Sequence, residues 1–146
     1  MNNIQHSANL DDLAAEAIRL GREVADRARA TNLGGNAKDA ARAARCLASL
    51  DDRSPFSTAD EGGLAVIKEI FEKDLKSEVL GTETRFIETH YDEFGQQGEM
   101  REVPIYSCRG AELVYLGMAL NEFIVIRASV LDHIAAHRAL LSLMSG

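Results

Sequence analysis

Apolar residues recur at a spacing of seven in the last third of the chain, and this pattern constrains the fold more than any other feature. Two series of this spacing are offset from each other by three positions. They are Leu113, Leu120, Arg127, Ile134 and Leu141, and Leu116, Phe123, Val130, His137 and Met144. Spacing kept over more than four repeats predicts one long helix, about 111–144, whose apolar seam another helix covers.

Two alternatives qualify this helix. The β-branched run Phe123-Ile-Val-Ile126 also fits a buried strand, because such residues disfavour a helix, and Gly117 is a possible kink. The series of seven passes through both places without a change of phase, which favours the helix. At 1.5 Å per residue the helix is about 50 Å long, more than a domain of this size needs.

The excess length predicts that one end of the helix projects and pairs with a second copy of the chain. The predicted dimer seam consists of Leu116, Leu120, Phe123, Arg127, Val130 and His137. Arg127 in such a seam binds a carboxylate or backbone carbonyls from another element or another chain, because an unpaired buried charge is very costly. The alternative is that its long side chain extends to solvent at the edge of the seam. A homodimer is therefore expected, and the polar seam residues would set its register.

Three helices are predicted before this one. Asn9 can cap the first helix, which Gly34 and Gly35 end. Asn36 caps a second helix that runs to about Leu50, and the short turn predicts an antiparallel αα-hairpin. Thr58-Ala-Asp-Glu61 is a capping box that begins a third helix ending near Gly81.

The segment from 84 to 106 differs in character. Residues 84–92 and 101–106 are rich in β-branched and aromatic side chains, and glycines lie between them. We expect a β-hairpin that packs on helices or pairs with another edge, because two strands alone are marginally stable. The predicted fold is thus α+β, mainly helical, in one domain over 1–146.

Charge and composition narrow the function classes. The chain has 146 residues, a net charge of −7 and two cysteines. No stretch reaches the roughly 18 uninterrupted apolar residues of a membrane span, and residues 1–13 do not resemble a signal peptide. We therefore expect a cytoplasmic protein without a membrane contact. No catalytic, nucleotide-binding or haem motif is found, so no cofactor and no enzymatic activity are predicted.

The leading functional prediction is a protein-binding module that acts through an acidic hairpin. Its predicted contact residues are Glu88, Asp92, Glu93, Glu99 and Glu102. An acidic surface of this kind suits an inhibitor that occupies a basic groove on a larger nucleic-acid-handling complex, for example in phage or mobile-element counter-defence. This last step is an expectation about a class of proteins, since a fold does not imply a function.

Two alternative functions stay open. A small metal-dependent or Cys/His enzyme would use His133 and His137, which are four residues apart on one helix face, together with His90 or Cys108. A DNA- or RNA-binding regulator would use Arg22, Arg29 and Arg42 in the basic segment 19–45. That segment has seven arginines and lysines against three acids, but it has no aromatic residue for base stacking.

Overall fold

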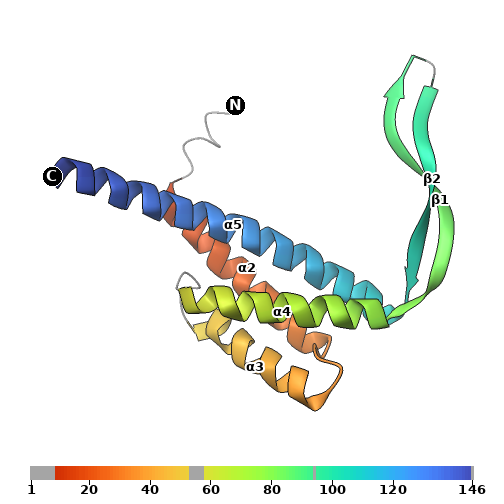
Figure 1. The fold of residues 1–146 in the computed structure, drawn as a ribbon, viewed down its shortest axis with the longest axis horizontal. Helices are drawn as coiled ribbons and strands as arrows, with labels where there is room; N and C mark the ends of the chain where they lie inside the picture. The colour runs from red at the N-terminus through yellow and green to blue at the C-terminus, as the bar shows by residue number, and fades with distance from the viewer. Residues whose placement is uncertain (1–8, 53–57, 94, 146) are drawn as a thin grey trace.

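The structure is a computed structural model that describes residues 9–52, 58–93 and 95–145. Its elements follow the order α2 (Leu10–Ala30), α3 (Ala37–Asp52), α4 (Thr58–Ser77), β1 (Val79–Asp92), β2 (Gly95–Tyr106) and α5 (Cys108–Ser145). The helices form a bundle from which a two-stranded hairpin extends (Figure 1). The predicted mainly helical α+β fold is confirmed.

Local signals set most helix starts. The Asn9 side chain accepts a hydrogen bond from the Asp12 amide at 2.8 Å, as expected of an N-cap. Asn36 caps α3 in the same way through the Asp39 amide, also at 2.8 Å. Helix α2 ends at Ala30, earlier than the glycines predict, because Asn32 adopts a left-handed conformation with φ of 53°.

Helix α5 is continuous from Cys108 to Ser145, so Phe123–Ile126 is helical and the rival strand interpretation is wrong. Its 38 residues correspond to about 57 Å. Gly117 does not interrupt it. A Cβ atom at Gly117 would lie 2.6 Å from Cζ of Phe71, so this glycine allows the ring from α4 to approach the α5 backbone.

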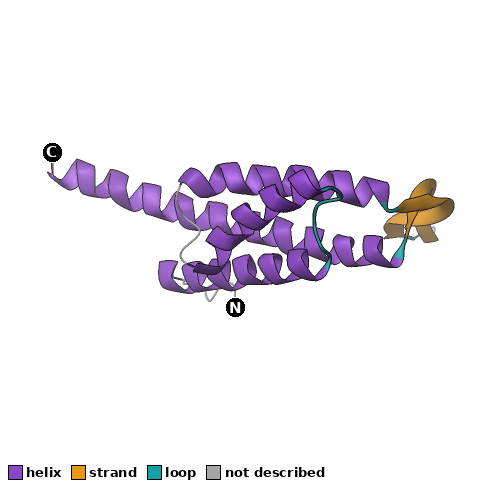
Figure 2. Cartoon of the chain, turned by 90° about the horizontal axis from the view of Figure 1, so that it is seen from below, coloured by secondary structure: helices purple, strands orange, loops and turns teal. Residues whose placement is uncertain are grey.

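The core lies between the seam of α5 and the helices packed on it. Helix α2 runs antiparallel to α5, and α3 and α4 form a second pair beside them (Figures 1 and 2). Phe123 is fully buried, and its ring lies where a Cβ atom of Gly21 would be 3.2 Å away. Leu20 and Val24 of α2, Leu47 of α3 and Ile67 and Ile70 of α4 belong to the same core.

The hairpin differs from its prediction in extent and in position. Helix α4 ends at Ser77, and Gly81 lies inside β1 instead of ending that helix. The strands are 14 and 12 residues long, well beyond the predicted ones. They extend away from the helices and contact the body only near their base (Figure 1). Within the described residues, the hairpin therefore does not pack on the helices as expected.

Candidate protein-binding site

The register of the hairpin gives it two chemically different faces. Directly paired residues of an antiparallel sheet lie on the same face, and alternate residues lie on opposite faces. Phe86 pairs with Met100 and Thr84 with Glu102, whereas Arg85 pairs with Arg101 between them. A register shift lies between Glu88 and His90, after which Tyr91 pairs with Gln96. We call the two surfaces the Phe86 face (Thr84, Phe86, Glu88, Tyr91, Met100 and Glu102) and the Arg85 face (Glu83, Arg85, Ile87, Glu99, Arg101 and Val103).

The Phe86 face exposes large apolar side chains. Phe86 is 49% exposed, Met100 63% and Tyr91 76%. The Phe86 ring reaches across to the other strand, where a Cβ atom at Gly98 would lie 2.7 Å from its Cζ. Gly98 thus makes room for the ring beside Met100, and the two side chains form an apolar centre in mid-hairpin.

Acidic residues flank this apolar centre on the same face. On this face, Glu102 lies on one side of the Phe86–Met100 pair and Glu88 lies on the other, each two residues along its strand. Both glutamates are exposed. Within the part of the chain that the structure describes, neither carboxylate forms a salt bridge. The Phe86 face therefore combines uncompensated negative charge with exposed apolar area.

The Arg85 face neutralises its own charges. Arg85 forms an ion pair with Glu83, and Arg101 forms one with Glu99. Glu99, a predicted contact residue, is therefore occupied by an arginine of the same strand. Ile87 and Val103 on this face are half-buried, unlike the apolar residues of the Phe86 face.

The remaining predicted acidic residues lie at the tip. Glu93 is exposed in the turn after β1. Asp92 is the last residue of β1 and pairs with Gly95, which has a φ of 110° that favours glycine. The tip and the Phe86 face thus form one acidic end of the molecule.

Arg109 fixes the base of the hairpin to the helices. Its Nε donates to the Thr31 carbonyl at 2.9 Å, and its Nη2 donates to the Asn32 carbonyl at 3.1 Å. The same guanidinium forms ion pairs with Asp74 at 2.8 Å and with Glu78 at 3.1 Å. Hydrogen bonds to Asp74 and Glu78 raise the pKa of Arg109. One side chain therefore joins the α2–α3 loop, the end of α4 and the start of α5.

Two further residues complete this base. The buried Asp74 accepts a hydrogen bond from the Gly34 amide at 2.8 Å. Ser107 donates its hydroxyl to Glu78 at 2.7 Å and accepts from the Gly110 amide at 3.0 Å, which caps α5. The Ser107 hydroxyl, followed by Arg109, lowers the pKa of Glu78. These contacts set the direction in which the hairpin leaves the body.

Sequence reasoning missed this base because its contacts join residues far apart in the chain. Arg109 is 35 positions from Asp74 and 78 from Thr31. The only local signal was Ser107 three residues before Gly110, a spacing typical of an N-cap. That signal predicts the cap but not the carboxylates that Arg109 binds.

The predicted dimer seam lies mainly inside this chain's own core. Leu116, Leu120, Phe123 and Val130 are buried. Arg127 is 6% exposed and lies 3.7 Å from Glu61 of α4, a carboxylate from another element of the same chain. His137, in contrast, is exposed. Because the chain itself covers the first part of the seam, a contact with a second copy through this seam would use the part beyond Val130.

Neither His90 nor Cys108 is brought to His133 and His137, the pair proposed for metal or cysteine chemistry. His133 and His137 are exposed on α5, and Nδ1 of His133 is 2.7 Å from the Ser129 carbonyl. His90 is on the hairpin, and Cys108 is exposed at the start of α5. Over the described ranges, no three His, Cys, Asp or Glu side chains form a group that could hold a metal ion.

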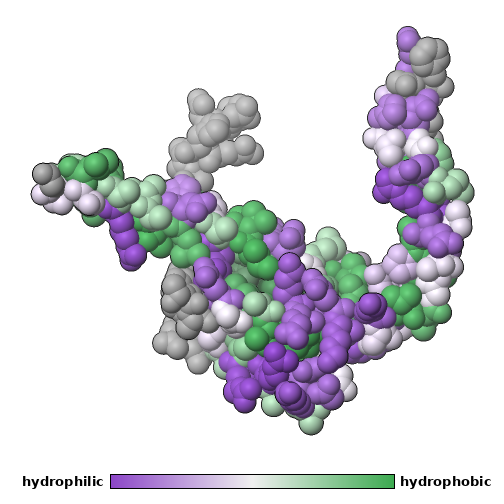
Figure 3. All heavy atoms as spheres, in the orientation of Figure 1, coloured by the Kyte–Doolittle hydropathy of each residue, from purple (hydrophilic) through white to green (hydrophobic). Residues whose placement is uncertain are grey.

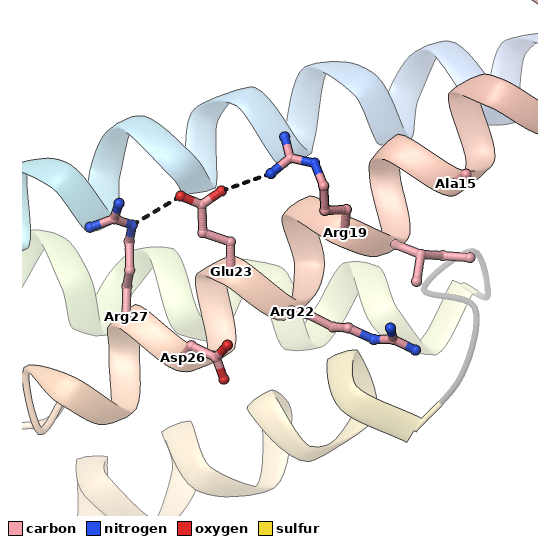
Figure 4. A pocket seen from close by; sticks show the side chains of 7 residues that line it. Ala15, Arg19, Arg22, Glu23, Asp26 and Arg27 are labelled. Carbon is pink, nitrogen blue, oxygen red and sulfur yellow. Dashed lines mark hydrogen bonds and ion pairs between the residues drawn. The ribbon is translucent and has the colours of Figure 1, made fainter.

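The basic segment carries many internal ion pairs. An open depression on α2 is lined by residues that include Arg19, Arg22, Glu23 and Arg27, and Figure 4 shows Arg19 and Arg27 both directed at Glu23. Arg22 points away from this group (Figure 4). The other two proposed phosphate contacts lie elsewhere. Arg29 lines a groove between α2 and α3, and Arg42 binds Asp39 at 3.2 Å and Glu69 at 3.4 Å.

Comparisons with models of known protein families, with curated proteins and with solved structures found no match to this chain.

Helix α5 is long and apolar enough to cross a membrane when judged by length and composition alone. Core helices of soluble proteins meet the same criterion, and 39% of its most apolar window is buried here. The candidate site therefore rests on the hairpin's own geometry.

Proposed function

We propose that this chain is a non-enzymatic protein-binding module whose contact surface is the Phe86 face of the hairpin. The observation that carries the proposal is the exposed Phe86–Met100 pair between two uncompensated glutamates, on a ribbon that leaves the helical body. Aromatic residues and methionine are enriched at the centres of protein interfaces, whereas polar and charged residues surround them at the rim. The Phe86 face has this arrangement.

The low stability expected of an uncovered hairpin also supports the proposal that a partner covers it. An isolated two-stranded hairpin is marginally stable in water, and three strands or packing on a helix are normally needed. Within the residues that the structure describes, both strands have a free edge, and the large apolar residues of the Phe86 face are exposed. A partner that covers this face would remove that apolar area from water and would stabilise the strands.

The charge of the face indicates the chemistry of the partner. Glu88 and Glu102 flank the apolar centre, so the complementary surface is an apolar pocket with lysines or arginines around it. Opposite charges of this kind accelerate association, and salt weakens the effect. Basic grooves are frequent on proteins that handle nucleic acids. An acidic hairpin in such a groove would compete with nucleic acid, so we propose an inhibitory role.

The test compares two double charge reversals with the same change in net charge. Glu88→Lys with Glu102→Lys alters the Phe86 face. Glu72→Lys with Glu112→Lys alters exposed glutamates on the helices and serves as the control. Each protein, and the wild type, is immobilised and exposed to host lysate, and the captured proteins are quantified by mass spectrometry. Binding of the leading captured protein is then measured with purified components at low and high salt.

We expect the wild type and the control to capture the same basic proteins, and the Phe86-face variant to lose them. The purified complex should weaken as salt is raised, and Phe86→Ser should weaken it at every salt concentration. Nucleic acid should compete with the chain for this partner. The proposal is refuted if both reversals lose binding equally, or if neither does.

A further inference from the structure

Helix α5 continues beyond the helices that cover its seam. Ile134 is its last half-buried residue, and every residue from 135 to 145 is exposed. Leu141 is 50% exposed, and Met144 is 75% exposed. Figures 1 and 2 show this end extending past the other helices, and Figure 3 shows hydrophobic residues gathered on it.

The apolar seam does not stop where its cover stops. Val130 is buried, and the two series of seven continue beyond it through Ile134 and Leu141 and through His137 and Met144. On a helix of 3.6 residues per turn, these positions form one stripe in line with Val130. The stripe therefore extends the surface that already packs against an antiparallel helix, α2.

We propose that residues 131–145 of α5 pair antiparallel with the same residues of a second copy of this chain. This surface is distinct from the hairpin of the proposed function. A symmetric pair requires each contact to occur twice, so the stripe must complement itself. One two-fold axis places Ile134 against the partner copy's Met144 and His137 against its Leu141, because both pairs share one midpoint at position 139. The partner helix then takes the antiparallel direction that α2 takes along the buried part.

The charge of the stretch also fits an identical partner. Between Leu131 and Ser145 the charged residues are one acid, Asp132, and one arginine, Arg138. Two copies of such a stretch meet with little repulsion. A strongly charged partner, such as nucleic acid, would find few opposite charges on it. Low charge and exposed leucines favour a second apolar helix.

The size of the contact predicts weak association. Fifteen helical residues span about 22 Å. Two helices of this length that touch along one stripe bury less than the roughly 800 Å² per partner of a standard interface. We therefore expect a reversible dimer in the micromolar range. The hairpins lie at the opposite end of each body (Figure 1), so such a dimer presents two of them and raises the avidity for a partner with two sites.

The test uses two leucines that are two residues apart on opposite sides of the same exposed helix. Leu141 lies in the stripe, and Leu143, which is 80% exposed, lies opposite it. Wild type, Leu141→Asp and Leu143→Asp are compared by sedimentation velocity from about 1 to 300 μM, the range in which weak complexes form. Circular dichroism confirms that each variant keeps its helical content.

We expect a dimer for the wild type and for Leu143→Asp, and a monomer for Leu141→Asp at every concentration. His137→Leu should strengthen the dimer by about tenfold or more, because it replaces a polar residue that faces an apolar one. A wild type that stays monomeric overturns the proposal, and so does an equal weakening by both aspartates.

A membrane surface is the competing occupant of the stripe. A further experiment with lipid vesicles distinguishes membrane binding from dimer formation. The same three proteins are sedimented with vesicles of phosphatidylcholine and phosphatidylglycerol. Vesicle binding by a monomeric wild type that Leu141→Asp abolishes would assign the stripe to lipid and overturn the dimer. Failure of the hairpin variants to alter capture leaves this experiment unaffected, since the two surfaces share no residue.

Discussion

Removal of the Arg109 side chain should destabilise the fold more than removal of any surface arginine. Arg109→Ala deletes two hydrogen bonds to the Thr31 and Asn32 carbonyls and two ion pairs. It leaves the Asp74 side chain, which is 5% exposed, with the hydrogen bond from the Gly34 amide. Breaking a fully buried ion pair from one side costs about 3–5 kcal/mol.

The structure lowers that figure, because the Arg109 side chain is 30% exposed and water can partly replace it. Each lost carbonyl hydrogen bond contributes about 1 kcal/mol. We therefore expect a loss of about 3 kcal/mol in the free energy of unfolding, which corresponds to a fall in Tm of about 6–12 °C for a chain of this size. Arg109→Lys should recover only part of it, since a single ammonium cannot reach both carbonyls and both carboxylates.

Urea unfolding followed by circular dichroism measures this loss, and Arg101→Ala is the control. Arg101 and its partner Glu99 are both more than half exposed, so this substitution should cost less than about 1 kcal/mol. Asp74→Asn in the Arg109→Ala background should then add less than it does alone, because the two residues act together. A loss below about 0.5 kcal/mol for Arg109→Ala would refute the role assigned to it.

Three further predictions concern the body. Lys73, followed by Arg42 and Asn36, lowers the pKa of Asp39. The ionised Asp39 carboxylate therefore stabilises the fold at neutral pH, and this stabilisation is lost as the pH falls below about 4. Asp39→Asn should flatten this part of a stability-against-pH curve measured by urea unfolding. Phe123→Ala should cost about 3–5 kcal/mol, measured the same way, because the ring is fully buried; a cost near 1 kcal/mol would contradict its central place. Gly34→Ala should cost about 1–3 kcal/mol, since φ is 109° and a Cβ atom would lie 2.5 Å from the Ala40 amide nitrogen; an unchanged Tm would disprove the clash.

Sequence reasoning succeeded where the signal is local. The caps at Asn9 and Asn36 were predicted because a capping side chain bonds an amide three residues away. The continuity of α5 through Phe123–Ile126 was predicted because a helical stripe depends only on spacing along one element. The hairpin was predicted from composition, but its strands proved longer, since strand ends carry no signal as specific as a cap.

The candidate site was predictable only in part. The acidic character of the hairpin follows directly from its residues. Its division into two faces does not, because the pairing register between β1 and β2 decides which side chains of the two strands lie together. The sequence predicted that Glu99 acts together with Glu88 and Glu102, whereas in the structure Glu99 lies beside Arg101 on the opposite face.

The sequence by itself determined that this chain is mainly helical and that its last helix carries an apolar seam. Both follow from contacts within four or seven residues. Only the tertiary structure decided what covers that seam: α2 and α4 pack on α5, the seam is buried as far as Val130, and from His137 onward it is exposed. It also decided that Arg109 joins the α2–α3 loop to Asp74 and Glu78 at the base of the hairpin. Such choices depend on contacts between residues 31 or more positions apart, and no local pattern in the chain encodes them.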